Sequence, residues 1–118
     1  MMRRMDKVNQ RMKEEIGEIV LHELKDPRLE FVTITQVVVS RDLQHARVYY
    51  SVLGTEEQVK RAKSGLASAR GLIRRLIGER VRMRYTPEIE FIRDPSLEYS
   101  ARIEAALKEI HRELGEDH

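Results

Sequence analysis

The sequence predicts an α+β domain, and three features of its pattern support that class. Apolar residues recur every three or four positions in long segments, as in amphipathic helices. Three shorter segments are rich in β-branched or alternating apolar residues, as in strands. Turn residues separate these segments, without repeats, low-complexity tracts or long linkers. At 118 residues, the chain is expected to form one domain, residues 1–118.

The composition limits the chemistry available to this domain. No cysteine is present, which excludes disulfides, thiol catalysis and cysteine-ligated metal sites. Aromatic residues make up 5% of the chain and tryptophan is absent, so the core is expected to be aliphatic. The basic N-terminus has no apolar h-region, and no apolar run approaches the roughly 18–20 residues of a membrane span. We therefore expect a soluble, cytoplasmic protein.

Residues 4–25 have the pattern of a first helix. Its apolar face is formed by Val8, Met12, Ile16, Ile19, Val20 and Leu24. Asp26-Pro27 is expected to end the helix, because the residue before a proline disfavours the helical region. The outer face of the first half carries Arg3, Arg4, Lys7, Arg11 and Lys13. This basic half is either an RNA contact or an ordinary solvated face.

Two predicted strands follow, and a third comes later in the chain. Residues 31–39 are β-branched and residues 45–53 alternate, so the two segments are expected to pair as an antiparallel hairpin. Residues 88–93 alternate apolar and charged side chains and form the third expected strand. Residues 81–84 are a further extended candidate, which Thr86-Pro87 interrupts.

A last helix is expected over about residues 96–114, after Asp94-Pro95 ends the third strand. Ser96 or a neighbour can cap it. Its apolar stripe consists of Leu97, Ser100, Ile103, Ala106 or Leu107, Ile110 and Leu114. We expect this helix to pack on the domain; projection from the domain and docking on a partner are the alternatives. The domain then has a core of about residues 4–95 and a C-terminal helix of about 96–114.

Residues 60–84 concentrate the positive charge of the chain. They hold nine cations against one acid, whereas the whole chain has a formal net charge of only +2. The cations are Lys60, Arg61, Lys63, Arg70, Arg74, Arg75, Arg80, Arg82 and Arg84. An apolar stripe at helical spacing runs beside them, and Thr55 with Gln58 forms a capping box for the helix start. Clustered basicity of this kind favours phosphate binding.

Small residues in the middle of this segment predict a helix, a kink and a second helix that ends near Gly78. The kink is expected at Ala69-Arg70-Gly71, because glycine costs about 1 kcal/mol relative to alanine inside a helix and often marks a bend. A helix beginning at Gly71 would present unpaired backbone N–H groups, which form an anion site. The alternative is that Gly71 only permits close packing on a neighbouring helix.

Motifs for catalysis are sparse. The chain has no GxxxxGK[ST], GxGxxG or HExxH motif. Its histidines are scattered over separate elements, which does not favour a zinc site. Ser40, Asp42 and His45 contain the residue types of a hydrolase triad, but a hairpin turn supplies neither a held geometry nor an oxyanion hole, so a solvated turn is favoured. We expect a binding protein rather than an enzyme, with no cofactor and no metal.

The order of the expected elements corresponds to a known variant of the α+β class. The first six elements, αββααβ, have the order of the type II KH fold, and a C-terminal helix follows them. A KH domain places GxxG between its paired helices to clamp a nucleic-acid backbone. Here Ala69-Arg70-Gly71 stands in place of GxxG. Such a domain is expected to bind RNA by shape and charge more than by reading bases.

A more specific resemblance runs from about residue 4 to residue 114. The residues that carry it are Leu24-Lys25-Asp26-Pro27-Arg28-Leu29, Val32-Thr33-Ile34-Thr35, Val37, Val39, Ser40-Arg41-Asp42-Leu43, Ala46-Arg47-Val48-Tyr49, Ser51-Val52-Leu53-Gly54, Ala69-Arg70-Gly71-Leu72-Ile73-Arg74, Arg82-Met83-Arg84, Pro87-Glu88-Ile89-Glu90-Phe91 and Asp94-Pro95-Ser96-Leu97. In this order and spacing they resemble the bacterial ribosome-binding factor A family.

The resemblance implies a KH-like fold with the Ala-x-Gly kink and a role in ribosome biogenesis. It implies binding to the free small (30S) ribosomal subunit, contact with 16S rRNA and support of late maturation, including 5′-end processing of that rRNA. It also implies a role in cold adaptation and release by a ribosome-assembly GTPase. The family has no catalytic activity of its own. We expect the chain to act as a monomer.

The residues expected to bind rRNA phosphates are basic side chains of the two helical regions. They are Arg3, Arg4, Lys7, Arg11, Lys60, Lys63, Arg70, Arg74, Arg75 and Arg82. Three alternatives remain: a general KH-like RNA-binding module, a protein-interaction domain with an acidic partner, and a small hydrolase or nuclease. Metal-dependent RNA cleavage would indicate the last alternative. Binding that survives nuclease treatment would indicate a protein partner.

Overall fold

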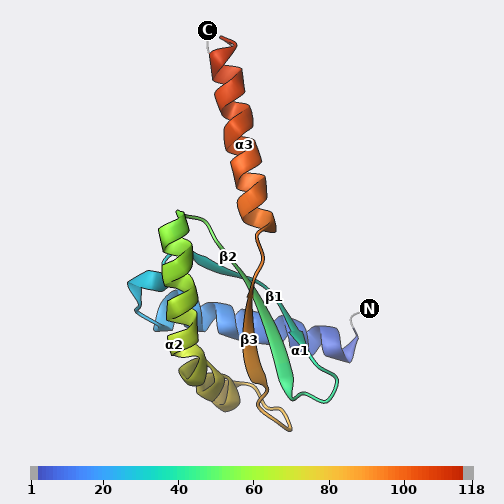
Figure 1. The fold of residues 1–118 in the computed structure, drawn as a ribbon. Helices are drawn as coiled ribbons and strands as arrows, with labels where there is room; N and C mark the ends of the chain where they lie inside the picture. The colour runs from blue at the N-terminus through green and yellow to red at the C-terminus, as the bar shows by residue number, and fades with distance from the viewer. Residues whose placement is uncertain (1–2, 116–118) are drawn as a thin grey trace.

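The computed structural model describes residues 3–115 and contains three α-helices and three strands in these residues (Figure 1). The predicted domain also includes residues 1–2 and 116–118, which lie outside the described part. The elements are α1 (Arg4–Glu18), η1 (Ile19–Glu23), η2 (Pro27–Leu29), β1 (Val32–Val39), β2 (His45–Val52), α2 (Glu56–Arg80), β3 (Glu88–Arg93) and α3 (Ser96–Glu113). The α+β class and the three expected strands are confirmed.

The sheet has the order β1-β2-β3, with β2 in the centre. β1 and β2 form the expected antiparallel hairpin, with an irregularity between Ile34 and Gln36. β2 and β3 run parallel, and the ladder begins where the Glu88 N–H donates to the Gln44 carbonyl at 2.8 Å. Parallel neighbours require a crossover connection, and here α2 supplies it. β3 lies at the edge of the sheet, and a loop joins it to the end of α2.

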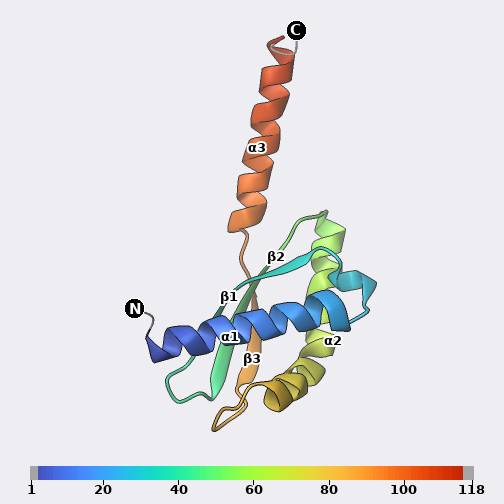
Figure 2. The ribbon, with the colours of Figure 1, turned by 180° about the vertical axis from the view of Figure 1, so that it is seen from behind.

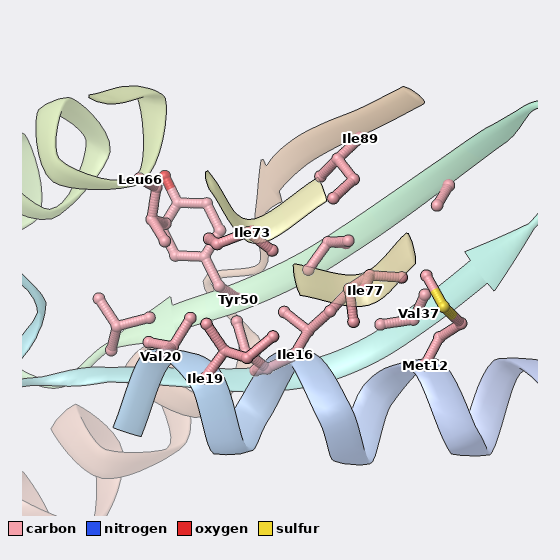
Figure 3. Packing of buried hydrophobic residues seen from close by; sticks show 14 of the residues in the cluster. Met12, Ile16, Ile19, Val20, Val37, Tyr50, Leu66, Ile73, Ile77 and Ile89 are labelled. Carbon is pink, nitrogen blue, oxygen red and sulfur yellow. The ribbon is translucent and has the colours of Figure 1, made fainter. Parts of the chain in front are cut away.

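One face of the sheet carries the helices α1 and α2, and the core lies between the two layers (Figures 1 and 2). Figure 3 shows apolar side chains of both helices meeting those of the strands. Met12, Ile16 and Ile19 are fully buried on the N-terminal side, and Ile73 and Ile77 are fully buried on α2. Tyr50 is the large aromatic side chain of this core, 3% exposed. The expected aliphatic core is thus present.

The first helical segment ends close to its predicted boundary but changes form before it does. The α-helical hydrogen bonding of α1 stops at Glu18, and one π-helical turn, η1, continues to Glu23. The turn that follows is capped by Asp26, whose carboxylate accepts from the Arg28 backbone N–H at 2.9 Å and from its guanidinium at 2.7 Å. These Arg28 hydrogen bonds hold the pKa of Asp26 below its usual value.

The basic segment forms one helix, so the prediction of two helices is wrong. α2 is helical without a break from Glu56 to Arg80, and Thr55 and Gln58 form the predicted capping box. Figures 1 and 2 show the axis of α2 bending in its second half while the ribbon stays continuous. A glycine in the interior of a continuous helix leaves no free N–H groups, so the predicted anion site at Gly71 does not form by this route.

Two glycines of α2 have opposite surroundings. A Cβ at Gly71 would meet nothing within 4 Å, so the alternative that Gly71 permits close packing on a neighbouring helix is also wrong. A Cβ at Gly65 would lie 2.9 Å from Leu29 Cδ2 and 3.2 Å from Arg28 Cβ. The close approach that small residues allow therefore occurs at Gly65, where η2 packs on α2.

Residues 81–84 form no strand and belong to the loop that joins α2 to β3. Arg74 fixes the end of this loop, because its guanidinium donates to the Thr86 carbonyl at 2.9 Å and to the Pro87 carbonyl at 3.2 Å. Arg74 also lies 3.4 Å from the Glu88 carboxylate. The loop is thus held to α2 where β3 begins.

α3 projects from the end of the sheet instead of packing along the domain (Figures 1 and 2). The molecule is correspondingly elongated, with principal extents of 60 × 36 × 19 Å. The apolar side chains Ile103, Leu107, Ile110 and Leu114 are 44–69% exposed. The side chains of Leu97 and Ser100, which were expected in the same stripe, lie outside the described part. The expectation that α3 packs on the domain is wrong, and the alternative of projection is observed.

Candidate nucleic-acid interface

A groove between α2 and β3 brings together three of the predicted RNA-binding residues, Lys60, Lys63 and Arg70. It has a volume of about 580 Å³, and four cations line it: Lys60, Lys63, Arg70 and Arg93. Its floor is apolar and consists of Tyr50, Val59, Ala67, Phe91 and Ile92. A single acid, Glu90, also lines it. The combination of a basic rim and an apolar floor suits an anionic chain that also carries flat apolar groups.

The spacing of the helix residues explains why these cations share one side. Lys60, Lys63 and Arg70 recur at helical intervals, so they lie along one stripe of α2 beside β3. Ala67 falls on the same stripe, and its short side chain leaves the space that becomes the groove. The buried stripe at Ala62, Leu66, Ile73 and Ile77 faces the sheet and fixes the rotation of the helix. The hydrophobic pattern thereby determines which cations line the groove.

The opposite wall of the groove is the free edge of β3. The backbone N–H groups of Glu88 and Asp94 donate toward β2, to the carbonyls of Gln44 at 2.8 Å and Tyr50 at 2.6 Å. Alternate residues of a parallel strand point their backbone groups to opposite sides, so Phe91 directs its N–H and C=O to the unpaired edge. The Phe91 ring packs edge-on against Tyr50, with 6.4 Å between the ring centroids. This wall therefore offers hydrogen-bonding groups next to an aromatic surface.

A second basic cluster lies where α1 passes the end of α2. Lys7 and Arg11 of α1 lie beside Arg80 and Arg82, around the apolar residues Val8, Val81 and Met83. Arg11 donates to the Arg80 carbonyl at 3.3 Å and lies 3.2 Å from the Glu15 carboxylate.

Arg80 of this cluster is neutralised by acids of the first helical segment. It pairs with Glu23 and lies 3.9 Å from a Glu15 oxygen. The hydrogen bonds from Arg80 hold the pKa of Glu23 below its usual value. The positive charge of this second cluster thus comes mainly from Lys7 and Arg82.

The remaining predicted residues are divided between binding and structural positions. Arg3 and Arg4 are exposed at the start of α1, where the Asp6 carboxylate accepts from the Arg3 backbone N–H at 3.3 Å. Arg75 is exposed on α2 and does not line the α2/β3 groove. Arg74 is committed to the loop before β3, as described above. Lys60, Lys63 and Arg70, by contrast, form no hydrogen bond or ion pair with the rest of the described chain.

Arg93 is the groove residue that sequence reasoning missed. It is the last residue of β3 and comes directly before Asp94-Pro95, so its position suggested only the end of a strand. A signal was nevertheless available, because Arg93 is the one basic residue of the EIEFIR segment and follows two acids at alternate positions. Which side chain faces α2 depends on the parallel pairing of β3, and local periodicity does not specify that pairing.

The hairpin turn that contains Ser40, Asp42 and His45 is held by hydrogen bonds of its own. The Ser40 hydroxyl donates to Asp42 at 2.6 Å and accepts from the His45 backbone N–H at 3.0 Å. The hydrogen bond from Ser40 holds the pKa of Asp42 below its usual value. This arrangement agrees with the solvated-turn interpretation. Within residues 3–115, no group of three or more histidine or acidic side chains is placed to hold a metal ion.

A comparison with known families identifies the family to which the chain belongs. A family model described as ribosome-binding factor A matches residues 4–107. The chain belongs to the ribosome-binding factor A family. Ribosome-binding factor A is a non-enzymatic ribosome-binding factor, which agrees with the prediction of a binding protein. Among the described helices, none is long and apolar enough to cross a membrane.

Solved structures of ribosome-binding factor A share the fold of this chain over about three quarters of its length. The crystal structure of ribosome-binding factor A from Thermus thermophilus is 30% identical, with a TM-score of 0.66, over 75% of this chain and 94% of that chain. The solution structure of a Thermotoga maritima protein, provisionally assigned as ribosome-binding factor A, is 36% identical, with a TM-score of 0.64, over 73% and 82% of the two chains.

A third similar structure is a homology model of Thermus thermophilus ribosome-binding factor A that was fitted into a cryo-electron-microscopy map of its complex with the 30S subunit. It is 31% identical, with a TM-score of 0.59, and the match covers 74% of this chain and 91% of that chain.

Proposed function

We propose that this chain is a ribosome assembly factor that binds the free small ribosomal subunit through the groove between α2 and β3. The observation that carries this proposal is the set of three cations, Lys60, Lys63 and Arg70, that line one groove without partners in the described chain. Family membership supports it, and so does the similarity to a protein fitted into a 30S complex. Cations that are not used within the fold remain available to neutralise rRNA phosphates.

The proposed mechanism involves binding alone. Phosphate contacts position the domain on 16S rRNA, and a KH-like groove without GxxG holds the backbone by shape and charge. A protein that binds one rRNA conformer better than another shifts the population toward that conformer. In this way the chain supports late maturation, including formation of the 5′ end of 16S rRNA, without any covalent step. The chain acts as a monomer, and an assembly GTPase releases it from the matured subunit.

The second basic cluster supports the same function from the other end of α2. About ten helical residues separate Arg70 from Arg80, which corresponds to about 15 Å along a helix axis. Lys7 and Arg82, with Arg11 beside them, therefore reach a different phosphate group than the groove cations do. We include Arg3, Arg4 and Arg75 as outer contacts and treat Arg74 as structural.

The test is co-sedimentation of purified protein with free small subunits at several salt concentrations. Lys60→Glu combined with Lys63→Glu should lower the affinity at least tenfold. The slope of the logarithm of the binding constant against the logarithm of the salt concentration should become shallower by about two units. Both side chains are exposed, so the variant should keep the wild-type free energy of unfolding.

The matched control makes the same change in net charge at two residues outside the groove. Arg41→Glu combined with Lys108→Glu alters two exposed cations on the hairpin turn and on α3, away from the groove. It should bind nearly as well as wild type. Equal losses in both double variants would show that net charge, rather than the groove, determines binding. Wild-type binding by the groove variant would contradict the proposal.

A further inference from the structure

The junction between β3 and α3 joins the basic groove to the projecting helix through one pair of side chains. Arg93, at the end of β3, lines the groove. Its Nε donates to Oε1 of Glu98 at 3.3 Å, and Glu98 belongs to the first turn of α3. The pair thus connects a candidate RNA contact with the attachment of a helix whose main contact with the domain is near β2.

Glu98 is an unusual residue to find at such a position. Its side chain is 6% exposed, and Oε1 also accepts from the Val52 backbone N–H at 2.8 Å. Its Oε2 is buried and has no partner within the described chain. A buried carboxylate is costly unless it is paired and hydrogen-bonded. The hydrogen bond from the Val52 N–H and the charged Arg93 side chain together offset part of the cost of burying Glu98.

Arg93 keeps N–H donors that are not used by Glu98 and can bind a further group. A guanidinium has five N–H donors, and Glu98 engages only Nε. The Arg93 side chain is 38% exposed, and it lies in the groove together with Lys60, Lys63 and Arg70. A guanidinium held at Nε presents its two terminal nitrogens as a fork, which matches a phosphate in two-point geometry. Glu98 thus fixes the direction in which that fork points.

We propose that Arg93 is a phosphate-contacting residue of the groove and that Glu98 is its positioning residue, so that RNA binding and attachment of α3 stabilise each other. This inference rests on the proposed function of the groove. RNA bound in the groove favours the orientation of Arg93 in which it contacts Glu98, and this contact keeps the first turn of α3 attached to the domain. Conversely, when α3 is attached, Glu98 holds the Arg93 side chain in the orientation that binds RNA. Because coupling between two equilibria is reciprocal, each must strengthen the other by the same factor.

The first test measures binding of a short unstructured RNA oligonucleotide and of free small subunits. Glu98→Gln keeps an oxygen that accepts from the Val52 N–H but removes the charge that holds Arg93. We expect a three- to tenfold loss of affinity, and a similar loss for Arg93→Lys, which keeps the charge but not the fork. Glu109→Gln is the control, since Glu109 is an exposed acid of α3 that interacts with Arg112. It should bind like wild type.

A double variant separates positioning from a general structural effect. If Glu98 acts through Arg93, Glu98→Gln should cause no further loss in an Arg93→Ala background. Equal additional loss in that background would overturn the proposal, and so would wild-type affinity of Glu98→Gln. Absence of binding by the wild-type protein would overturn the proposed function of the groove as well.

The reciprocal test follows the attachment of α3 directly. Trypsin cleaves after basic residues, and Arg102 and Lys108 are exposed on α3. RNA should slow cleavage at these positions in the wild-type protein and have a smaller effect in Arg93→Ala. Arg93→Lys, which keeps a cation next to the buried carboxylate, serves if Arg93→Ala does not fold. Equal protection by RNA in wild type and variant would overturn the coupling.

Discussion

Helices α2 and α3 have similar amphipathic patterns but different environments. α2 buries Ala62, Leu66, Ile73 and Ile77 against the sheet, whereas the described apolar side chains of the α3 stripe from Ile103 to Leu114 are exposed. The difference arises from the sheet, which presents one face to helices, and α1 and α2 already cover that face (Figures 1 and 2). An apolar stripe therefore shows that a helix is able to pack, but the rest of the fold decides whether a surface is available.

The largest expected effect tests this contrast with one substitution in each helix. Ile77→Ala removes a fully buried side chain and should lower the free energy of unfolding by about 2–5 kcal/mol. Leu107→Ala removes a side chain that is 51% exposed and should change it by no more than about 0.5 kcal/mol. Urea unfolding measures both values. A loss for Leu107→Ala comparable to that for Ile77→Ala would show that α3 packs on a surface in solution.

An intermediate effect sharpens the comparison within α2 itself. Gly65→Ala places a methyl group against the buried Leu29 and should cost about 1–3 kcal/mol. Gly71→Ala adds the same group in open space, at a residue without positive φ, and should stabilise the protein by about 0.5–1 kcal/mol. Thermal unfolding measures both. Destabilisation by Gly71→Ala would show that the bend in α2 depends on this glycine.

The smallest expected effect concerns the η2 turn, which is capped by Asp26 and packs on α2. The hydrogen bonds from Arg28 lower the pKa of Asp26, so the folded state binds this proton more weakly than the unfolded state. Its contribution to stability is complete above the unfolded pKa, about 3.9, and is lost as the pH falls through the folded pKa.

Asp26→Asn tests this contribution, because asparagine can still accept from the Arg28 backbone N–H. The difference in the free energy of unfolding between wild type and variant should be constant near neutral pH and should shrink below about pH 4. Urea unfolding from pH 3 to pH 7 gives the profile. A difference that stays constant throughout would contradict the ionic role of Asp26.

The sequence was most informative where a feature depends on neighbouring residues. Thr55 and Gln58 predicted the start of α2, because a capping box is complete within four positions. The hairpin was predictable for the same reason, since residues 31–53 contain both strands and their turn. The local charge pattern also placed Lys60, Lys63 and Arg70 among the expected phosphate contacts, and these three residues line the groove.

Features that depend on distant contacts were harder to predict. Arg74 is also an arginine and lies on the same stripe of α2 as Arg70, but its guanidinium donates hydrogen bonds to the carbonyls of Thr86 and Pro87. Gly71 suggested a helix boundary, and yet a glycine within a long apolar stripe can remain helical because the packing of Ile73 and Ile77 outweighs its propensity. The parallel pairing of β3, which brings Arg93 to the groove, has no local signal.

The parallel pairing of β3 with β2 also determines when the groove can exist during folding. The pair His45–Glu88 joins strands that lie on either side of the whole of α2, so closing it costs more chain entropy than closing the hairpin does. The hairpin and α2 contain mainly local contacts and can form earlier. A chain that ends before Glu88 would keep every cation of α2 but lack the wall that faces them. We therefore expect the groove to assemble after the hairpin and α2, once residues 88–93 are available to pair with β2.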